Sequence, residues 1–94
     1  MQHTPTESEI TEQLDASGLA CPLPLLKAKQ ALSRMAPGEV LKVIATDSGS
    51  VRDFRVYVDN SDHEMLDSFT EGESYIHIIR RGTMMQKGGK TPNA

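Results

Sequence analysis

Residues 22–35 have the sequence PLPLLKAKQALSRM and carry the clearest helical pattern in the chain. Apolar side chains recur at the spacing of one helix face, at Leu25, Ala28, Leu32 and Met35. An Ala-Pro-Gly sequence follows directly, and Pro and Gly beyond the last turn are typical helix stop signals. We therefore expect an amphipathic helix that packs on a sheet through this apolar face.

Strand patterns lie on both sides of this helix. Residues 39–46, EVLKVIAT, are rich in β-branched and apolar side chains, which predicts a buried strand entered from a tight turn. Upstream, residues 12–15 can start a short strand, and Ser17 and Gly18 then turn the chain. The helix therefore connects two strands.

Residues 51–60, VRDFRVYVDN, fit two interpretations. The VYV sequence at 56–58 has strand propensity. Three apolar side chains instead share one helical face: Val51, Phe54 and Val58. Ser50, with Asp53 three residues later, also resembles a capping box that has Asp in place of Glu. The pattern narrowly favours a helix.

The end of the folded unit has the pattern of a β-hairpin. Two short runs, 63–70 and 74–81, are joined by a Gly-containing turn. In the second run Ile76 and Ile78 alternate with Tyr75, His77 and Ile79. We expect the Ile76 and Ile78 pair to face the helices.

The predicted order is β-α-β-α-β-β, an α/β fold in which two helices cover one face of a sheet. A chain of 94 residues suffices for one small domain. We expect a flexible lead over residues 1–11, a folded domain over 12–81 and a disordered Gly-containing tail over 82–94. The uncovered face of the sheet is a candidate interaction surface.

Composition excludes several classes of function. The formal net charge of −3 argues against a dominant nucleic-acid-binding role. A single cysteine permits neither an internal disulfide nor a zinc ribbon, and His3, His63 and His77 lack ligand spacing, so we expect no metal site. No stretch approaches the ~20 apolar residues that span a bilayer, and the polar N-terminus lacks a secretory pattern. We expect a cytoplasmic protein without membrane contact.

The chemical feature of the sequence is GLACPLP, residues 18–24. Cys21 directly precedes the predicted helix, with Pro22 expected at its first position and Pro24 in its first turn. The amides of Leu23 and Leu25 remain as possible partners for the sulfur. Because a helix N-terminus carries partial positive charge, this position predicts a lowered thiol pKa and a reactive thiolate.

The lack of a second cysteine limits the chemistry of Cys21. Pro24 stands where a CxxC pair would have its resolving thiol, so an internal disulfide cannot form. What remains is covalent uptake of a group and its transfer to a partner. Two alternatives stay open: an inert cysteine buried in the core, and a redox sensor that forms sulfenic acid or a mixed disulfide.

The sequence around Cys21 resembles the CPxP signature of the TusA-like, or SirA-like, sulfur carrier family. The matching positions are Leu14, Asp15, residues 18–24 and Lys27. The resemblance continues along most of the predicted domain. Its further matches are Pro37-Gly38-Glu39, Asp47, Arg52-Asp53, His63-Glu64 and residues 79–82.

The resemblance implies a two-layer α/β sandwich of order β-α-β-α-β-β, with a four-stranded mixed sheet, both helices on one face and residues 51–60 helical. It implies that Cys21 accepts sulfane sulfur as a persulfide from a cysteine desulfurase or rhodanese-type donor. The sulfur would pass to a partner protein in tRNA thiolation, molybdenum cofactor assembly or sulfur oxidation. No cofactor or metal is implied.

Other residues are expected to support this site. Gly18, Pro22 and Pro24 shape the motif, while Asp15 and Asp47 either cap turns or place negative charge near the thiol. We expect partner contacts from three charged side chains: Lys27, Arg52 and Asp53. A competing hypothesis is a regulatory module that binds protein or RNA through the sheet face, Arg80, Arg81 and the Lys-containing tail. The acidic domain and the lack of interleaved aromatics count against stable nucleic-acid binding.

Overall fold

The computed structural model describes residues 9–83. The observed order is β1 (Glu12–Ala16), α1 (Leu23–Ser33), β2 (Val40–Ala45), α2 (Gly49–Asp59), β3 (Glu64–Glu71) and β4 (Ser74–Arg80). The ambiguous residues 51–60 therefore belong to a helix, as the resemblance implied. Residues 1–8 and 84–94, which make up most of the expected flexible lead and disordered tail, lie outside the described part.

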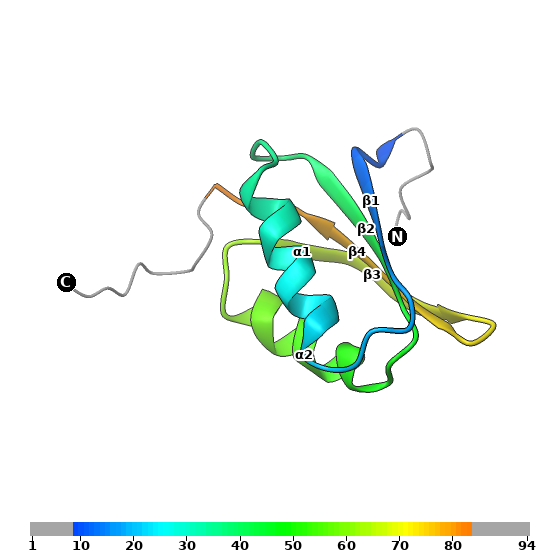
Figure 1. Ribbon diagram of the computed structural model, residues 1–94. Helices are drawn as coiled ribbons and strands as arrows, with labels where there is room; N and C mark the ends of the chain where they lie inside the picture. The colour runs from blue at the N-terminus through cyan, green and yellow to red at the C-terminus, as the bar shows by residue number, and fades with distance from the viewer. Residues whose placement is uncertain (1–8, 84–94) are drawn as a thin grey trace.

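The four strands form one mixed sheet with the order β1-β2-β4-β3. β1 runs parallel to β2, whereas β4 is antiparallel to both β2 and β3. Both helices lie on the same face of this sheet (Figure 1). The predicted two-layer α/β sandwich is thus confirmed. β4, the last strand within residues 9–83, therefore lies between β2 and β3 and pairs with both.

The core between the layers is built from the predicted apolar face of α1. Ala28, Ala31 and Leu32 are buried there, with Met35 just beyond the helix end. They pack against three groups of side chains: Leu41 and Val43 of β2, Phe54 and Val58 of α2, and Ile79 of β4. This packing holds α1 and α2 side by side over the sheet. It thereby sets the position of the residues at the N-terminal ends of both helices.

The orientation of β4 differs from the prediction. Ile79 and His77 face the helices, because they pair with the core residues Leu41 and Val43 of β2. Ile76 and Ile78 instead pack with Val40 in a second apolar cluster on the opposite face. Both faces of β4 carry apolar side chains, so alternation alone could not distinguish them, and an error of one residue reverses every side chain.

His77 occupies a core position that a hydrophobic side chain would usually fill. Its ring stacks on Phe54 of α2, with 4.6 Å between ring centroids. Both ring nitrogens have hydroxyl partners: Nε2 lies 3.2 Å from Ser50 Oγ, and Nδ1 lies 3.0 Å from Ser68 Oγ. Because its polar atoms are satisfied, this buried imidazole holds α2 onto β4.

The start of each helix also differs from the prediction. α2 begins after Ser48, and Ser50 lies within the helix, where it contacts His77. No side chain caps α2 at Ser48, so the proposed capping box between Ser50 and Asp53 is wrong. α1 begins at Leu23, which makes Pro22 its N-cap residue and Pro24 its second residue. Pro22 therefore precedes the first helical position instead of occupying it.

Residues just outside the expected domain are also held to it. Thr11 donates its amide hydrogen to the Val40 carbonyl at 2.8 Å, and Gly82 donates to His63 Nδ1 at 2.9 Å. The Thr83 hydroxyl donates to Asp62 Oδ2 at 2.6 Å. Within residues 9–83, neither helix is long and apolar enough to cross a membrane.

Candidate functional site

Cys21 lies in the connection between β1 and α1, and its side chain is exposed with a free thiol. The alternative of an inert cysteine in the core is therefore wrong. Two hydrogen bonds shape the turn before it. Ser17 donates its amide hydrogen to Asp15 Oδ1 at 3.0 Å, and Gly18 donates to Thr46 Oγ1 at 2.8 Å. Gly18 has a φ of +82°, a left-handed conformation that favours glycine.

The partner of the thiol is a carboxylate. Cys21 Sγ donates to Asp53 Oδ2 at 2.6 Å, a contact between residues 32 positions apart that joins the start of α1 to α2. The amide of Leu23, one of the two predicted donors to the sulfur, instead donates to the Ala20 carbonyl at 2.8 Å. Asp53, expected to contact a partner protein, is therefore already bound to the thiol within the chain.

The surroundings raise the pKa of Cys21 above its ordinary value. The hydrogen bond to Asp53 contributes most, followed by partial loss of hydration and by the negative charges of Asp53 and Asp47. A hydrogen bond that uses the thiol proton stabilises the neutral form, and nearby anions disfavour a thiolate. The predicted lowering of this pKa is therefore wrong. The helix N-terminus alone favours a thiolate, whereas Asp53 becomes a neighbour of the sulfur only in the folded chain.

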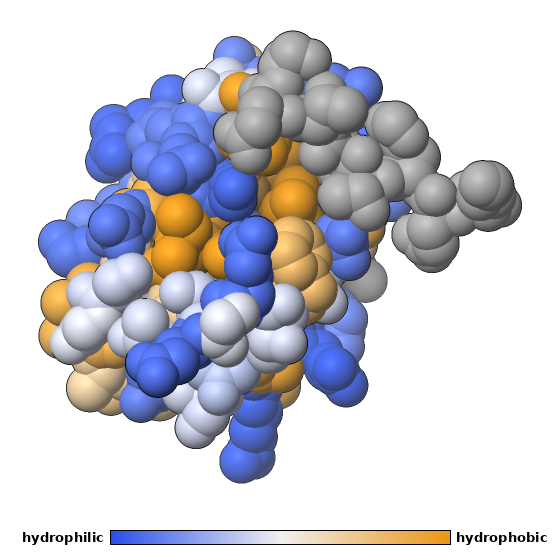
Figure 2. All heavy atoms as spheres, turned by 90° about the vertical axis from the view of Figure 1, so that its right-hand side faces the viewer, coloured by the Kyte–Doolittle hydropathy of each residue, from blue (hydrophilic) through white to orange (hydrophobic). Residues whose placement is uncertain are grey.

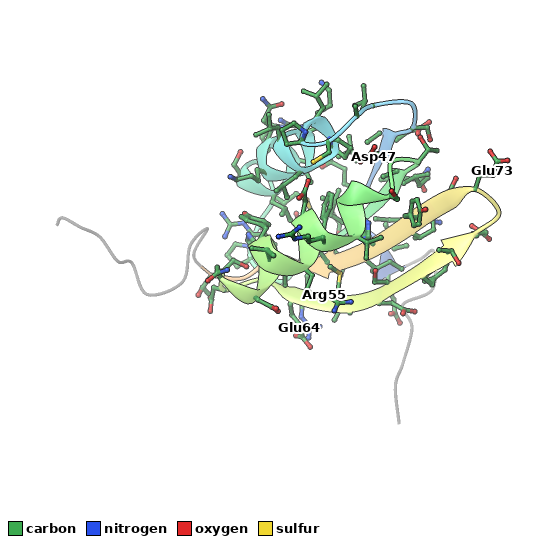
Figure 3. The ribbon with its side chains drawn as sticks, turned by 90° about the horizontal axis from the view of Figure 1, so that it is seen from below. Asp47, Arg55, Glu64 and Glu73 are labelled. Carbon is green, nitrogen blue, oxygen red and sulfur yellow. The ribbon has the colours of Figure 1, made fainter. Side chains whose placement is uncertain are left out.

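Asp47 lies where the connection after β2 enters α2 (Figure 3). Its Oδ2 accepts the amide hydrogen of Gly49 at 3.0 Å, so it holds the turn. Its charge also acts on Cys21, so the two roles considered for Asp47 coexist. Asp15, in contrast, serves its own turn, and the hydrogen bonds from Ser17 lower its carboxyl pKa.

Gly49 is a site residue that the sequence did not indicate. A Cβ atom at this position would lie 2.9 Å from Asp47 Oδ2 and 3.6 Å from Cys21 Sγ. The first distance is too short for a real contact, so a side chain here would displace Asp47. Glycine at position 49 thus leaves space for the Asp47 side chain next to the thiol, and no local pattern signals a contact between residues so far apart in sequence.

The remaining predicted residues lie around this centre. Pro22 is exposed, and its peptide bond to Cys21 is cis. Pro24 lies in the first turn of α1 and is buried. Lys27 and Arg52 are both exposed. Arg52 lines a hollow of about 400 Å³ together with Leu25, Asp53, Val56 and Tyr57. Through Asp53, this hollow between the helices adjoins the thiol site.

Apolar side chains are exposed on the same two helices. Leu23 and Leu26 of α1 are each 45% exposed, and Val56 of α2 is 51% exposed. At the end of the sheet that carries the β3–β4 turn, apolar side chains are exposed between hydrophilic ones (Figure 2). Exposed apolar groups next to a reactive side chain are typical of surfaces that bind other proteins.

The arginines of the RNA-binding hypothesis have partners within the chain. Arg80 forms an ion pair with Glu64. Arg81 donates to the Leu32 carbonyl at 3.0 Å and to the Gly82 carbonyl at 2.6 Å. Among residues 9–83, no group of three or more His, Cys, Asp or Glu side chains could hold a metal ion.

Known proteins resemble this chain over the whole of the sheet and both helices. Residues 12–81 match the family described as Sulfurtransferase TusA. The chain belongs to this family. The resemblance drawn from the CPxP motif is thereby confirmed, and the TusA match covers every element that positions Cys21.

Individual TusA relatives align over most of the chain. The sulfur carrier protein TusA of Allochromatium vinosum is 45% identical over 74 residues, which are 79% of this chain and 97% of the relative. A Neisseria meningitidis serogroup A protein, provisionally named a sulfur carrier, is 48% identical over 70 residues, 74% of this chain and 95% of its own. A Halobacterium salinarum protein with a similar provisional name is 39% identical over 74 residues, 78% of this chain and 91% of its own.

Proposed function

We propose that this protein is a sulfur carrier that holds sulfane sulfur as a persulfide on Cys21. The observation that carries the proposal is the exposed single thiol at the start of α1, hydrogen-bonded to Asp53 at 2.6 Å. Membership of the TusA sulfurtransferase family supports it. Without a second cysteine in the chain, a persulfide on Cys21 has no neighbouring thiol to reduce it.

The transfer needs no oxidant or reductant. Cys21 Sγ attacks the outer sulfur of a donor persulfide, a new S–S bond forms to Cys21, and the donor's own S–S bond breaks. The donor leaves as a thiol, so the proton of Cys21 balances the reaction, and Asp53 is placed to accept that proton. Delivery is the same exchange in the opposite direction, with a partner's sulfur as the attacking group.

The proposed donor is a cysteine desulfurase or a rhodanese-type protein in the cytoplasm. The acceptor belongs to tRNA thiolation, molybdenum cofactor assembly or sulfur oxidation. Leu23, Leu26 and Val56 offer apolar contact area beside the thiol, while Lys27 and Arg52 supply charge on the same helices. Such an apolar centre with a charged surround suits a transient complex.

Persulfide loading tests the proposal. The protein is incubated with a cysteine desulfurase and cysteine, and its intact mass is measured without reductant. We expect the mass of one sulfur atom to be added, and Cys21→Ser to remove this gain completely. The matched control Ser33→Ala, at the far end of α1, keeps it. No added sulfur with several desulfurases and rhodaneses would sink the proposal, and reaction with peroxide alone would support a redox sensor instead.

A further inference from the structure

We propose that Asp53 is a positioning and specificity-determining residue: it keeps the free Cys21 thiol protonated and favours reaction partners that bring positive charge to the sulfur. This inference deepens the proposed carrier function, because it concerns how the same site is controlled. It rests on the hydrogen bond that joins Cys21 Sγ to Asp53 Oδ2 at 2.6 Å.

The geometry gives Asp53 this role because the thiol lies between two elements. α1 supplies Cys21 at its N-terminus, where Pro22 and Pro24 provide no amide hydrogens. α2 supplies the carboxylate, and Phe54 next to it is fully buried against His77. Asp53 is therefore anchored by the core, and its position does not depend on a mobile loop.

The charges around the sulfur have one sign. Asp53 acts on it from α2, and Asp47 acts on it from the connection between β2 and α2. Both of these charged groups disfavour the thiolate. The thiolate, which is the reacting species, therefore forms next to two carboxylates.

A site of this kind discriminates between reagents by charge. An anionic sulfur compound meets repulsion from both carboxylates, whereas a cationic one is attracted and also stabilises the thiolate as it forms. The protein partner that fits is one that places an arginine, lysine or protonated histidine next to its reactive sulfur. Without such a partner the thiol stays protonated, which protects it from peroxide and other small oxidants.

Two measurements on the full chain test the inference without a sulfur donor. The first is the pH profile of Cys21 alkylation by neutral iodoacetamide. We expect Asp53→Asn to move the midpoint to lower pH and to raise the rate at neutral pH roughly threefold or more, because the amide that replaces the carboxylate carries no negative charge. Asp53→Glu keeps a carboxylate and should restore part of the original profile. Glu73→Gln, at the hairpin turn, removes the same charge elsewhere and should change nothing.

The second measurement compares cationic and anionic methanethiosulfonates, which form a disulfide with Cys21 and release methanesulfinate. At low salt we expect the cationic reagent to react at least about tenfold faster, with the ratio falling sharply in Asp53→Asn and, for the unaltered protein, in high salt. An unchanged pH midpoint in Asp53→Asn, or equal rates for both reagents, would overturn the inference. Failure of persulfide loading with these results intact would reject the carrier function alone.

Discussion

At the scale of single residues, Cys21 experiences two opposing electrostatic influences. The N-terminus of α1 carries roughly half an elementary charge, spread over amides of the first turn, and favours an anion. Asp53 carries a full negative charge, and its Oδ2 lies only 2.6 Å from the sulfur. Pro22 and Pro24 also lack backbone N–H groups, so two of the amides that would stabilise an anion at this helix end are missing. The carboxylate therefore dominates, and the thiol is the resting form.

Gly49 provides a residue-scale prediction about the space beside this thiol. In Gly49→Ala the new methyl group must displace the Asp47 side chain, because its position lies 2.9 Å from Asp47 Oδ2. The methyl group would also lie 3.6 Å from Sγ, and we expect it to crowd an added sulfur on this side of the thiol. We expect persulfide loading to slow by roughly tenfold while the protein stays folded, a cost typical of small misplacements in active sites.

The comparison for this prediction is Ser48→Ala, the preceding residue. Ser48 is exposed and makes no capping hydrogen bond through its side chain, so its variant should load sulfur at the original rate. Loading rates come from intact mass at timed intervals, and circular dichroism checks the fold. Equal loading by Gly49→Ala and the unaltered protein would show that this space is not needed.

At the scale of elements, α1 owes its position to the side chains beneath it. Leu32 is fully buried between the helices and the sheet, so Leu32→Ala leaves a cavity. We expect the free energy of unfolding to fall by about 2–5 kcal/mol, measured by urea denaturation. Leu26→Ala, an identical change on the exposed side of the same helix, should cost well under 1 kcal/mol. Similar losses for both variants would contradict this account of the core.

The elements differ in how far the sequence predicted them. α1 and β2 were predictable because each presents a clear period or a continuous apolar run. α2 combines a helical apolar face with the β-branched run at 56–58, so local propensity alone did not decide. The two faces of β4 could not be assigned, because Ile76 and Ile78 are as apolar as the core residue Ile79. The buried His77 of this strand has its hydrogen-bond partners, Ser50 and Ser68, on α2 and β3, so they are known only from the folded structure.

The candidate site was predictable only in part. Cys21 and the prolines follow from the motif itself, which is contiguous in sequence. The pairing with Asp53 spans 32 residues and exists only after α1 and α2 pack side by side. The direction of the Cys21 pKa shift depends on that pairing, which explains why reasoning from the helix N-terminus gave the opposite sign.

At the scale of the whole molecule, His77 makes stability depend on pH. Burial lowers the pKa of His77 to about 4, from an ordinary value of 6.5. Between these values the unfolded chain binds a proton that the folded chain excludes, so the free energy of unfolding falls as pH decreases from 6.5 toward 4. We expect a loss of about 2 kcal/mol between pH 7.5 and pH 5, measured from urea midpoints.

A non-titrating replacement isolates this contribution. His77→Gln can still hydrogen-bond to Ser50 or Ser68, and its stability should change less over the same pH interval. Some dependence should remain, because burial also lowers the pKa of His63. Identical pH slopes for His77→Gln and the unaltered protein would assign the effect to other groups.

The central place of β4 has a consequence for synthesis on the ribosome. The chain emerges from its N-terminus, yet the strand that joins β2 to β3 is made last. Until residues 74–80 leave the exit tunnel, β2 lacks its antiparallel neighbour, and Phe54 of α2 lacks the His77 ring on which it stacks. Since Asp53 is held next to Phe54, we expect a nascent chain that stalls before β4 to leave Cys21 without a firmly held carboxylate partner.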